Sequence, residues 1–189
     1  TLSVLVAGMS NAVVLDGDDS LRGRNISTLV TALRSAGVSV RYLGKDGHTP
    51  IEIQGPFYQN SSTIHLSETS QVLSAFILAA NSAIDGMTID LSGSSVSGPY
   101  SELSIRIARN CGATIQQSAS QIHIDSWLPA PPNQVTIPGD SSLAIMAVLA
   151  SRLYGIPVEL MGYPISQDSL FDFSLADMSE SLGISWARS

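Results

Sequence analysis

Residues 16–25, Asp-Gly-Asp-Asp-Ser-Leu-Arg-Gly-Arg-Asn, bring three aspartates and two arginines together in a chain that is otherwise poor in charge. They lie between a predicted strand and a predicted helix, whose first N–H groups attract anions. Arg22 and Arg24, in the predicted loop, could therefore grip a carboxylate or phosphate. An equally weighted alternative is that Asp16 to Asp19 neutralise the arginines on a solvated loop. A metal site is the weakest option, because the aspartate order and distal Glu of an EF-hand are absent.

Three other short segments place hydroxyl or acidic side chains at predicted helix starts. They are Glu-Thr-Ser-Gln (68–71), Ser-Val-Ser-Gly-Pro-Tyr (95–100) and Pro-Gly-Asp-Ser-Ser (138–142). Taken singly, each segment is typical of helix capping or turn formation. All of them, like Arg24, fall at strand-to-helix junctions. Together they predict one pocket for a phosphorylated, acidic substrate.

Other chemistries find little support in the sequence. His48, His65 and His123 lack metal-ligand spacing and are predicted to be structural. No nucleophile elbow, P-loop or dinucleotide-binding glycine pattern occurs. Cys111 is the single cysteine, so neither a disulfide framework nor a cysteine-based zinc site is expected. These features favour a cytoplasmic setting and no bound metal.

The charge balance narrows the choice of ligands. The net charge is −7, which argues against non-specific nucleic-acid binding. Lys45 is the one lysine, so an anion site must use arginines, backbone amides and hydroxyls. Charged residues make up 13% of the chain against a usual share of about 25%, which suggests a partly covered surface. No apolar run approaches the roughly 18 residues of a membrane helix, and no signal peptide is visible.

The elements that must position these residues alternate between strand and helix. Period-two and period-3.6 patterns predict an α/β (α+β) fold. Strands are predicted at 12–17, 38–43, 50–55, 62–67, 87–93, 113–118, 121–125, 135–139, 157–162 and 184–187, and helices at 25–37, 69–83, 98–112, 140–153 and 170–183. The first ten residues also have the pattern of a helix. The helix at 69–83 is apolar on nearly all sides and is expected to be buried.

The same order of elements recurs along the chain. Three stretches share a helix end, a glycine and then a strand, and Gly37, Gly112 and Gly183 are expected at helix C′ positions with positive φ. The chain is therefore interpreted as one globular domain of three βαβαββ repeats, with pseudo-threefold symmetry and buried helices. The approximate repeats are 1–61, 62–130 and 131–189. The first lacks its opening strand and the last its closing strand, which predicts a piece of a longer protein. The alternative is that the similarity arises by chance, because glycines and turns end helices and strands in any α/β protein.

Four motifs carry a resemblance to a known family. They are Leu-Arg-Gly-Arg (21–24), Thr-Ser-Gln-x-x-Ser-Ala (69–75), Ser-Gly-Pro-Tyr (97–100) and Gly-Asp-Ser-Ser (139–142). In this order and spacing they resemble the enolpyruvyl transferases, specifically the branch that acts on shikimate 3-phosphate. The resemblance implies an enzyme of two similar domains, each built from three such repeats. This chain would be the domain whose sequence is continuous in the middle of the enzyme.

The resemblance also implies an activity. The family joins phosphoenolpyruvate to the 5-hydroxyl of shikimate 3-phosphate and releases phosphate, on the route to chorismate, without a metal or organic cofactor. The chain would be a substrate-binding domain of a cytoplasmic monomer, with no membrane or nucleic-acid partner, and the second domain would close over it. The alternatives are a UDP-N-acetylglucosamine enolpyruvyl transferase domain, which the Leu-Arg-x-Arg motif disfavours, and a non-catalytic repeat module.

The motifs imply a substrate contact for each matching residue. Arg24 would bind phosphoenolpyruvate, Thr69, Ser70 and Ser97 the phosphate of shikimate 3-phosphate, Gln71 both substrates, and Tyr100 the neighbourhood of the shikimate ring, with Arg22 and Asp140 as further candidates.

Three positions depart from the family pattern. Asn25 stands where Pro is usual, Thr69 replaces a serine, and Gly98 stands where a lysine is common. The acid/base residues of the family belong to segments outside this chain. No catalytic residue is therefore assigned here, and the chain alone is expected to be inactive.

Overall fold

The computed structural model describes residues 1–66, 71–93, 98–135, 137, 141–161 and 183. The chain divides into two units, Thr1–Pro132 and Asn133–Ser189, and the boundary falls in the Pro-rich segment 128–134. The predicted single domain and the bounds of its three repeats stay predictions.

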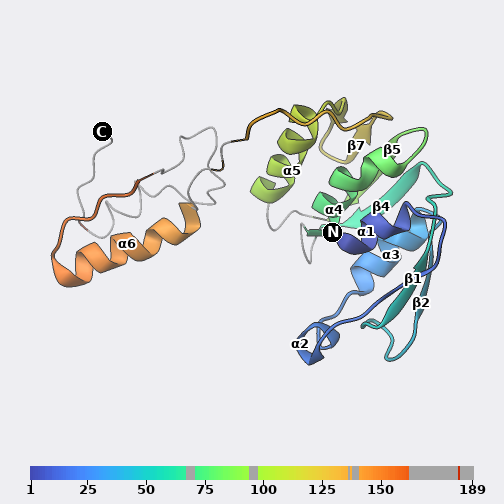
Figure 1. Ribbon diagram of the computed structural model, residues 1–189, viewed down its shortest axis with the longest axis horizontal. Helices are drawn as coiled ribbons and strands as arrows, with labels where there is room; N and C mark the ends of the chain where they lie inside the picture. Colours follow the sequence, from blue (N-terminus) through green and yellow to red (C-terminus); the bar gives the residue numbers. More distant parts are fainter. Residues whose placement is uncertain (67–70, 94–97, 136, 138–140, 162–182, 184–189) are drawn as a thin grey trace. The chain divides into compact units, whose positions relative to one another are not determined.

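The N-terminal part of the first unit contains a three-stranded antiparallel sheet (Figure 1). Its central strand β3 (Ile51–Gln54) pairs on one side with β1 (Val13–Leu15) and on the other with β2 (Ser39–Tyr42). Alternate residues face inward, so Val40, Ile51 and Ile53 are buried. Helices α1 (Leu2–Ala7) and α3 (Ser27–Ser35) contact this sheet. The predicted strands and the hairpin between the second and third of them are confirmed.

A second sheet of four strands follows in the same unit. Its order is β4 (Ser61–His65), β5 (Met87–Ser92), β7 (Gln121–Ile124) and β6 (Ile115–Gln117). The predicted hairpin of the last two strands is confirmed, and β4 and β5 are parallel. Parallel neighbours need a long crossover, which α4 (Gln71–Ala79) and the short 3-10 helix η1 (Ala80–Ser82) supply.

Helix α4 is the centre of the core, as its uniformly apolar sequence predicts. It contacts α1, α3 and α5 (Gly98–Asn110). Phe76 is 1% exposed and meets Phe57 with ring centroids 6.2 Å apart. Burying one such aromatic side chain stabilises the fold by about 1.5–3 kcal/mol. A helix without a polar face is stable here because neighbouring helices cover it on several sides.

Helices α3 and α5 end in the same way, and this similarity supports the repeat interpretation for the first two repeats. Gly37 and Gly112 follow them with φ of 78° and 102°. In both, the amide after the glycine donates to a carbonyl five residues earlier at 3.0 Å, from Val38 to Leu33 and from Ala113 to Ala108. This is the Schellman arrangement that satisfies the last carbonyls of a helix. Gly183 also has a positive φ, 68°, as predicted.

An arginine three residues before each of these two glycines makes a matching contact. Arg34 donates to the Val40 carbonyl at 2.7 Å, and Arg109 donates to the Ile115 carbonyl at 2.9 Å. Each bond ties the end of a helix to the strand that follows it. The strands β1, β2 and β3 also share their order and antiparallel pairing with β5, β6 and β7.

The described part of the second unit consists mainly of α6 (Ser141–Tyr154), which confirms the helix predicted at 140–153. The strand predicted at 157–162 is wrong, because the described segment 157–161 is not in a strand. Of the strand predicted at 135–139, only Val135 and Ile137 are described, and neither is in a strand. A strand exists only when a neighbour satisfies its backbone groups. No strand occurs among the described residues after 132, so these apolar runs have no partner there. The elements predicted at 170–183 and 184–187 lie outside the described residues, except for Gly183.

Candidate functional site

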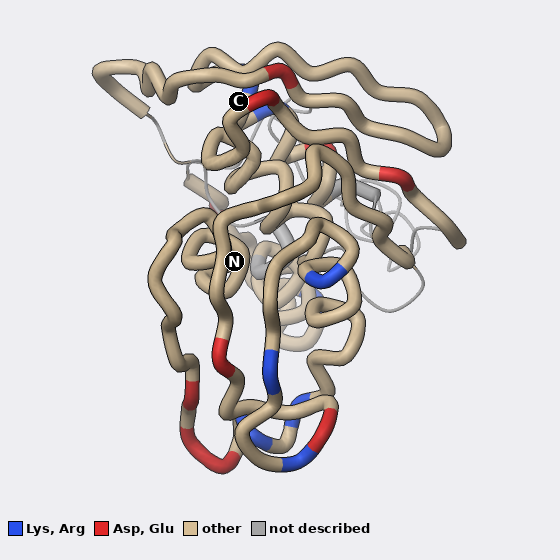
Figure 2. The backbone as a smooth tube through the Cα atoms, turned by 90° about the vertical axis from the view of Figure 1, so that its right-hand side faces the viewer, with Lys and Arg blue, Asp and Glu red and all other residues tan. Residues whose placement is uncertain are grey.

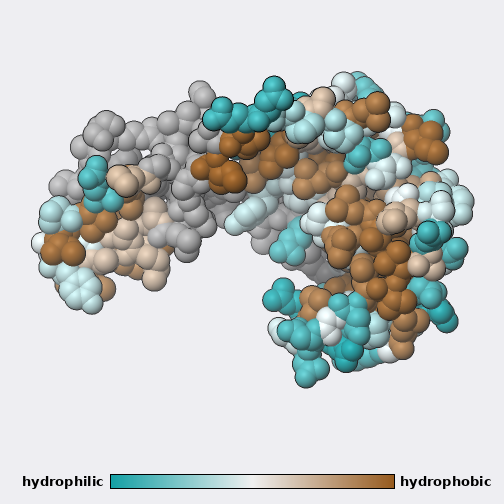
Figure 3. All heavy atoms as spheres, in the orientation of Figure 1, coloured by the Kyte–Doolittle hydropathy of each residue, from teal (hydrophilic) through white to brown (hydrophobic). Residues whose placement is uncertain are grey.

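The aspartates and arginines of residues 16–25 gather at the α2 end of the first sheet. Figure 2 shows charges of both signs at this end, and Figure 3 shows it as a largely hydrophilic region. The sequence predicted a loop for Arg22 and Arg24, but part of the segment is helical. Residues Asp19–Arg22 form the short helix α2, and the Asp18 side chain caps it by accepting from the Leu21 amide at 2.9 Å. Arg22 therefore ends a helix, while Arg24 lies in the connection to α3.

Arg22 is engaged by Asp16. Its Nε and one terminal nitrogen donate to the two carboxylate oxygens of Asp16 at 2.8 and 2.5 Å. These bonds, and then the one from the Gly17 amide, lower the pKa of Asp16 from 3.8 to about 2. The same pairing raises the pKa of Arg22. The neutralisation alternative thus applies to Arg22, which holds the turn together.

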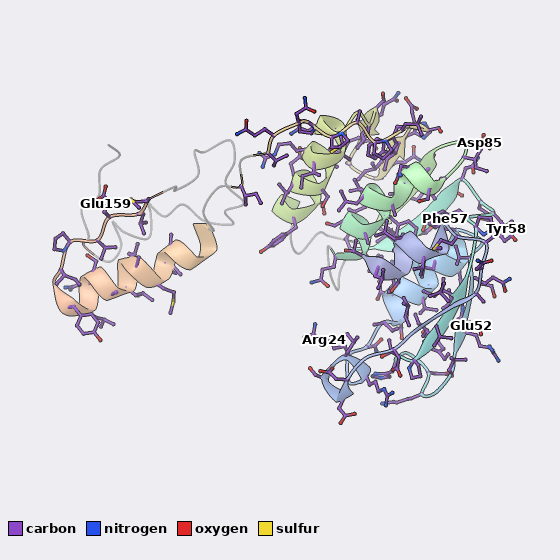
Figure 4. The ribbon with its side chains drawn as sticks, viewed as in Figure 1. Arg24, Glu52, Phe57, Tyr58, Asp85 and Glu159 are labelled. Atoms are coloured by element: carbon purple, nitrogen blue, oxygen red, sulfur yellow. The ribbon has the colours of Figure 1, made fainter. Side chains whose placement is uncertain are left out.

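Arg24 differs from its neighbour. Its side chain is exposed, and in the described part of the chain its guanidinium takes part in no hydrogen bond or ion pair. Figure 4 shows it beside α2, at the end of the first sheet. Its backbone is held, since the Arg24 amide donates to the Leu21 carbonyl at 3.1 Å. A guanidinium on a fixed backbone with unused donors is suited to binding a carboxylate or phosphate.

Asn25, a departure from the family pattern, has a structural role in this turn. Its side-chain oxygen accepts from the Ser27 amide at 2.8 Å and so satisfies one of the first N–H groups of α3. The next amide, that of Ile26, donates to the Gly47 carbonyl at 2.8 Å. The turn is therefore anchored without the fixed φ that a proline would supply.

The second part of the candidate site lies where β4 and β5 end and α4 and α5 begin. His65 and Ser92, the last residues of the two parallel strands, are partners in the sheet register, and their side chains are 2.6 Å apart. Gln71 is the first residue of α4, and Gly98 is the first of α5, which packs against α4. The chain connecting these ends carries the predicted phosphate ligands. Thr69, Ser70, Ser97 and also Asp140 lie outside the described residues.

Tyr100 is in the first turn of α5 and is 46% exposed. Its carbonyl accepts from Ser104 at 2.9 Å and from Ser74 of α4 at 3.5 Å. These bonds fix the Tyr100 backbone against α4, whose first residue is Gln71. The structure therefore brings the elements of Gln71 and Tyr100 together. It does not bring Arg24 to α5, which lies apart from it in Figure 4.

The three histidines make contacts typical of structural residues, as predicted. His48 and His65 have the hydrogen bonds of a turn and a sheet edge, and His123 lies 2.9 Å from Thr88 and 3.2 Å from Asp125. Within the described ranges, no group of three His, Cys, Asp or Glu residues could hold a metal ion. Among the same residues, no helix combines the length and apolar character needed to cross a bilayer.

Two features of the site were missed by sequence reasoning. The first is helix α2, whose one clear signal in the sequence is Asp18, a residue type that commonly caps the start of a helix. The second is the contact of the loop 43–50 with residues 22–26, made by the Gly47 carbonyl and by His48. That contact joins residues more than 20 positions apart, and local patterns carry no information about it.

Comparison with known proteins places these features in a family context. The family model for EPSP synthase (3-phosphoshikimate 1-carboxyvinyltransferase) matches residues 1–188. The 3-phosphoshikimate 1-carboxyvinyltransferases of Xenorhabdus nematophila and Cronobacter sakazakii are both 30% identical to this chain, over 178 and 182 residues. The matches cover 92% and 94% of this chain but 41% and 42% of those relatives, so the chain spans less than half of their length. An EPSP synthase structure from Acinetobacter baumannii shares the fold, with a TM-score of 0.64 and 21% identity, over 80% of this chain and 33% of that one.

Proposed function

Because the chain belongs to the EPSP synthase family, we propose that it is a substrate-binding segment of a 3-phosphoshikimate 1-carboxyvinyltransferase. The proposed reaction transfers the enolpyruvyl group of phosphoenolpyruvate to the 5-hydroxyl of shikimate 3-phosphate. The family match over residues 1–188 is the observation that carries this proposal. Since the chain spans 41% of its Xenorhabdus relative, the proposal concerns the complete gene product that contains it.

In this proposal Arg24 binds phosphoenolpyruvate. The support is its match to the Leu-Arg-x-Arg motif, together with an exposed guanidinium on an anchored backbone. A planar guanidinium can form two parallel hydrogen bonds with a carboxylate or phosphate. Arg22 is a weaker candidate, because Asp16 occupies its donors.

We assign the phosphate of shikimate 3-phosphate to Thr69, Ser70 and Ser97. Gln71 would contact both the shikimate ring and phosphoenolpyruvate, and Tyr100 would lie near the shikimate ring. The support is that α4 and α5 begin directly after these hydroxyl residues and pack against each other. Helix N-termini offer N–H groups and partial positive charge to a phosphate, and hydroxyls add further donors. Such a site needs no lysine, which suits a chain with Gly98 at the usual lysine position. Asp140 remains a further candidate at the start of α6.

Proton transfer is assigned to segments outside this chain. The reaction needs a base at the 5-hydroxyl and an acid at the methylene carbon of phosphoenolpyruvate. The resemblance implies that neither group belongs to the motifs present here, and that no metal or organic cofactor takes part. This chain would contribute binding and orientation of the two substrates.

Steady-state kinetics of the complete gene product test this proposal. We expect Arg24→Ala to raise the KM for phosphoenolpyruvate by roughly 10- to 100-fold, because a charge-assisted hydrogen bond contributes about 1.5–3 kcal/mol. Ser70→Ala should instead raise the KM for shikimate 3-phosphate.

Arg41→Ala is the matched control, because Arg41 is an exposed arginine of the same unit that already pairs with Glu52 at 3.1 Å. Both KM values should stay the same in that variant. Absence of turnover with this substrate pair would contradict the proposal. Turnover with UDP-N-acetylglucosamine in place of shikimate 3-phosphate would do so as well.

A further inference from the structure

The loop between β2 and β3, residues 43–50, makes a contact that bears on Arg24. The Nδ1 atom of His48 lies 2.9 Å from the carbonyl oxygen of Arg22. A carbonyl can only accept, so Nδ1 carries the proton and donates. The bond joins residues 26 positions apart in the sequence and ends two residues before Arg24.

The loop that presents His48 is held firmly at its base. Tyr42 and Ile51 are partners in the antiparallel register, and the Leu43 amide donates to the Pro50 carbonyl at 2.9 Å. Within the loop, the His48 amide donates to the Lys45 carbonyl at 3.2 Å. His48 itself is half-buried. The loop that carries His48 is therefore anchored to strands β2 and β3 of the first sheet.

The same loop holds the turn on the other side of Arg24. The Gly47 carbonyl accepts from the Ile26 amide at 2.8 Å, while His48 donates to the Arg22 carbonyl. These two bonds fix the backbone two residues before and two residues after Arg24. On the near side, the Arg24 amide also donates to the Leu21 carbonyl at 3.1 Å, the Arg22 and Gly23 amides donate to the carbonyls of Asp18 and Asp19, and Arg22 pairs with Asp16. The guanidinium of Arg24 thus projects from a segment fastened at both ends.

We propose that His48 is a positioning residue for Arg24, which acts by holding the Arg22–Ile26 turn in the conformation that presents the Arg24 guanidinium to an anionic substrate. This inference rests on the proposed role of Arg24. A long, exposed side chain loses much rotational freedom when it binds, and a fixed backbone limits that loss. His48 would therefore affect the affinity for the substrate that Arg24 binds, without contacting that substrate itself.

The test uses kinetics of the complete gene product with variants of His48. His48→Phe keeps a ring but has no donor, and we expect it to raise the KM for phosphoenolpyruvate roughly three- to ten-fold, the loss of one ordinary hydrogen bond. The KM for shikimate 3-phosphate should stay within two-fold. His48→Asn places an amide nitrogen near the position of Nδ1 and should restore the KM. His48→Gln, whose amide lies one bond farther out, should not.

A double-mutant cycle separates positioning from general stabilisation. In the Arg24→Ala background, His48→Phe should raise the KM for phosphoenolpyruvate no further, because the residue it positions is gone. His123→Phe is the matched control, since His123 makes a comparable hydrogen bond to Thr88 in the second sheet. It should lower the melting temperature without changing either KM.

The two proposals fail in different ways. If Arg24→Ala raises the KM for phosphoenolpyruvate but His48→Phe does not, the inference about His48 is overturned and the role of Arg24 stands. Additive effects in the double variant, or equal effects on both substrates, also overturn it. If Arg24→Ala leaves the KM unchanged, the role of Arg24 fails, and that of His48 fails with it.

Discussion

Arg22 and Arg24 are two positions apart and have opposite surroundings. Arg22 ends a helical turn, and its guanidinium is occupied by the carboxylate of Asp16. Arg24 follows the turn, and among the described residues its guanidinium has no hydrogen-bond or ion-pair partner. Composition alone could not separate the two, because both lie in one cluster of mixed charge. The distinction comes from the hydrogen-bond geometry and from the motif position of Arg24.

The pairing of Asp16 with Arg22 predicts an unusual titration. The pKa of Asp16 is lowered to about 2, so its carboxylate should titrate near pH 2 in an NMR experiment. In Arg22→Gln, which removes the charged hydrogen bonds, the midpoint should move up towards 3.8. Because the folded-state pKa is below the unfolded value, pairing favours the folded state above about pH 4. That contribution is lost as the pH falls through about 2.

Arg24→Gln provides the control for this titration. It removes an arginine from the same ten residues but leaves the donors of Arg22 in place, so the Asp16 midpoint should stay near 2. An equal shift in both variants would show that general positive charge, and not the specific pair, lowers the pKa. The proposed division of roles between the two arginines would then be wrong.

At the scale of elements, the helix ends after α3 and α5 allow a matched comparison. Gly37 and Gly112 both have positive φ, which costs a residue with a side chain about 1–2 kcal/mol. A Cβ at position 112 would have its nearest neighbours at 3.7 Å, but at position 37 it would lie 3.0 Å from the Tyr58 Cβ. We therefore predict that Gly112→Ala lowers the free energy of unfolding by about 1–2 kcal/mol and that Gly37→Ala lowers it more.

Chemical denaturation of the complete gene product would measure both values. The control is Ala119→Ser, in the exposed turn between β6 and β7, which removes no hydrogen bond and should alter stability little. The neighbouring Ser118 is unsuitable as a control, because its hydroxyl bonds to the Gln121 backbone. A neutral effect of Gly112→Ala would contradict the strain argument. A larger loss at 112 than at 37 would contradict the steric one.

Most elements could be predicted from the sequence, and the exceptions have physical causes. Helices such as α4 and α5 have apolar residues at helical spacing or on all sides, and the glycines mark where two of the helices end. Helix α2 is four residues long and contains one apolar residue, Leu21, so it has no periodic apolar pattern, and only its cap could have revealed it. The strand predicted at 157–162 failed because apolar alternation does not supply a pairing partner.

The candidate site was less predictable than the fold. Motif positions singled out Arg24, Gln71 and Tyr100, but nothing in the sequence indicated that the loop 43–50 supports the first of them. The bond from His48 to Arg22 depends on the pairing of β2 with β3 and on the direction of the connection after α2. Such long-range contacts follow from topology, and local propensity does not contain them.

At the scale of the whole molecule, the chain has features of a segment that works with others. It spans 41% to 44% of three 3-phosphoshikimate 1-carboxyvinyltransferases that it matches. Large apolar side chains are exposed in both units, among them Leu2 at 61% in the first and Leu153 at 77% in the second. Charged residues, which keep isolated domains soluble, make up only 13% of the sequence.

These features lead to a prediction about the 189 residues alone. In the proposed function, this chain supplies binding groups but no general acid or base, and the transfer cannot proceed without proton movement. We therefore expect the purified 189-residue chain to release no phosphate from phosphoenolpyruvate and shikimate 3-phosphate, whereas the complete gene product is expected to do so. The same preparation of Arg24→Ala is the control, since turnover by a contaminating host enzyme would be equal in both. Phosphate release that disappears in Arg24→Ala would mean that this chain contains its own acid and base, and the assignment of proton transfer to other segments would be wrong.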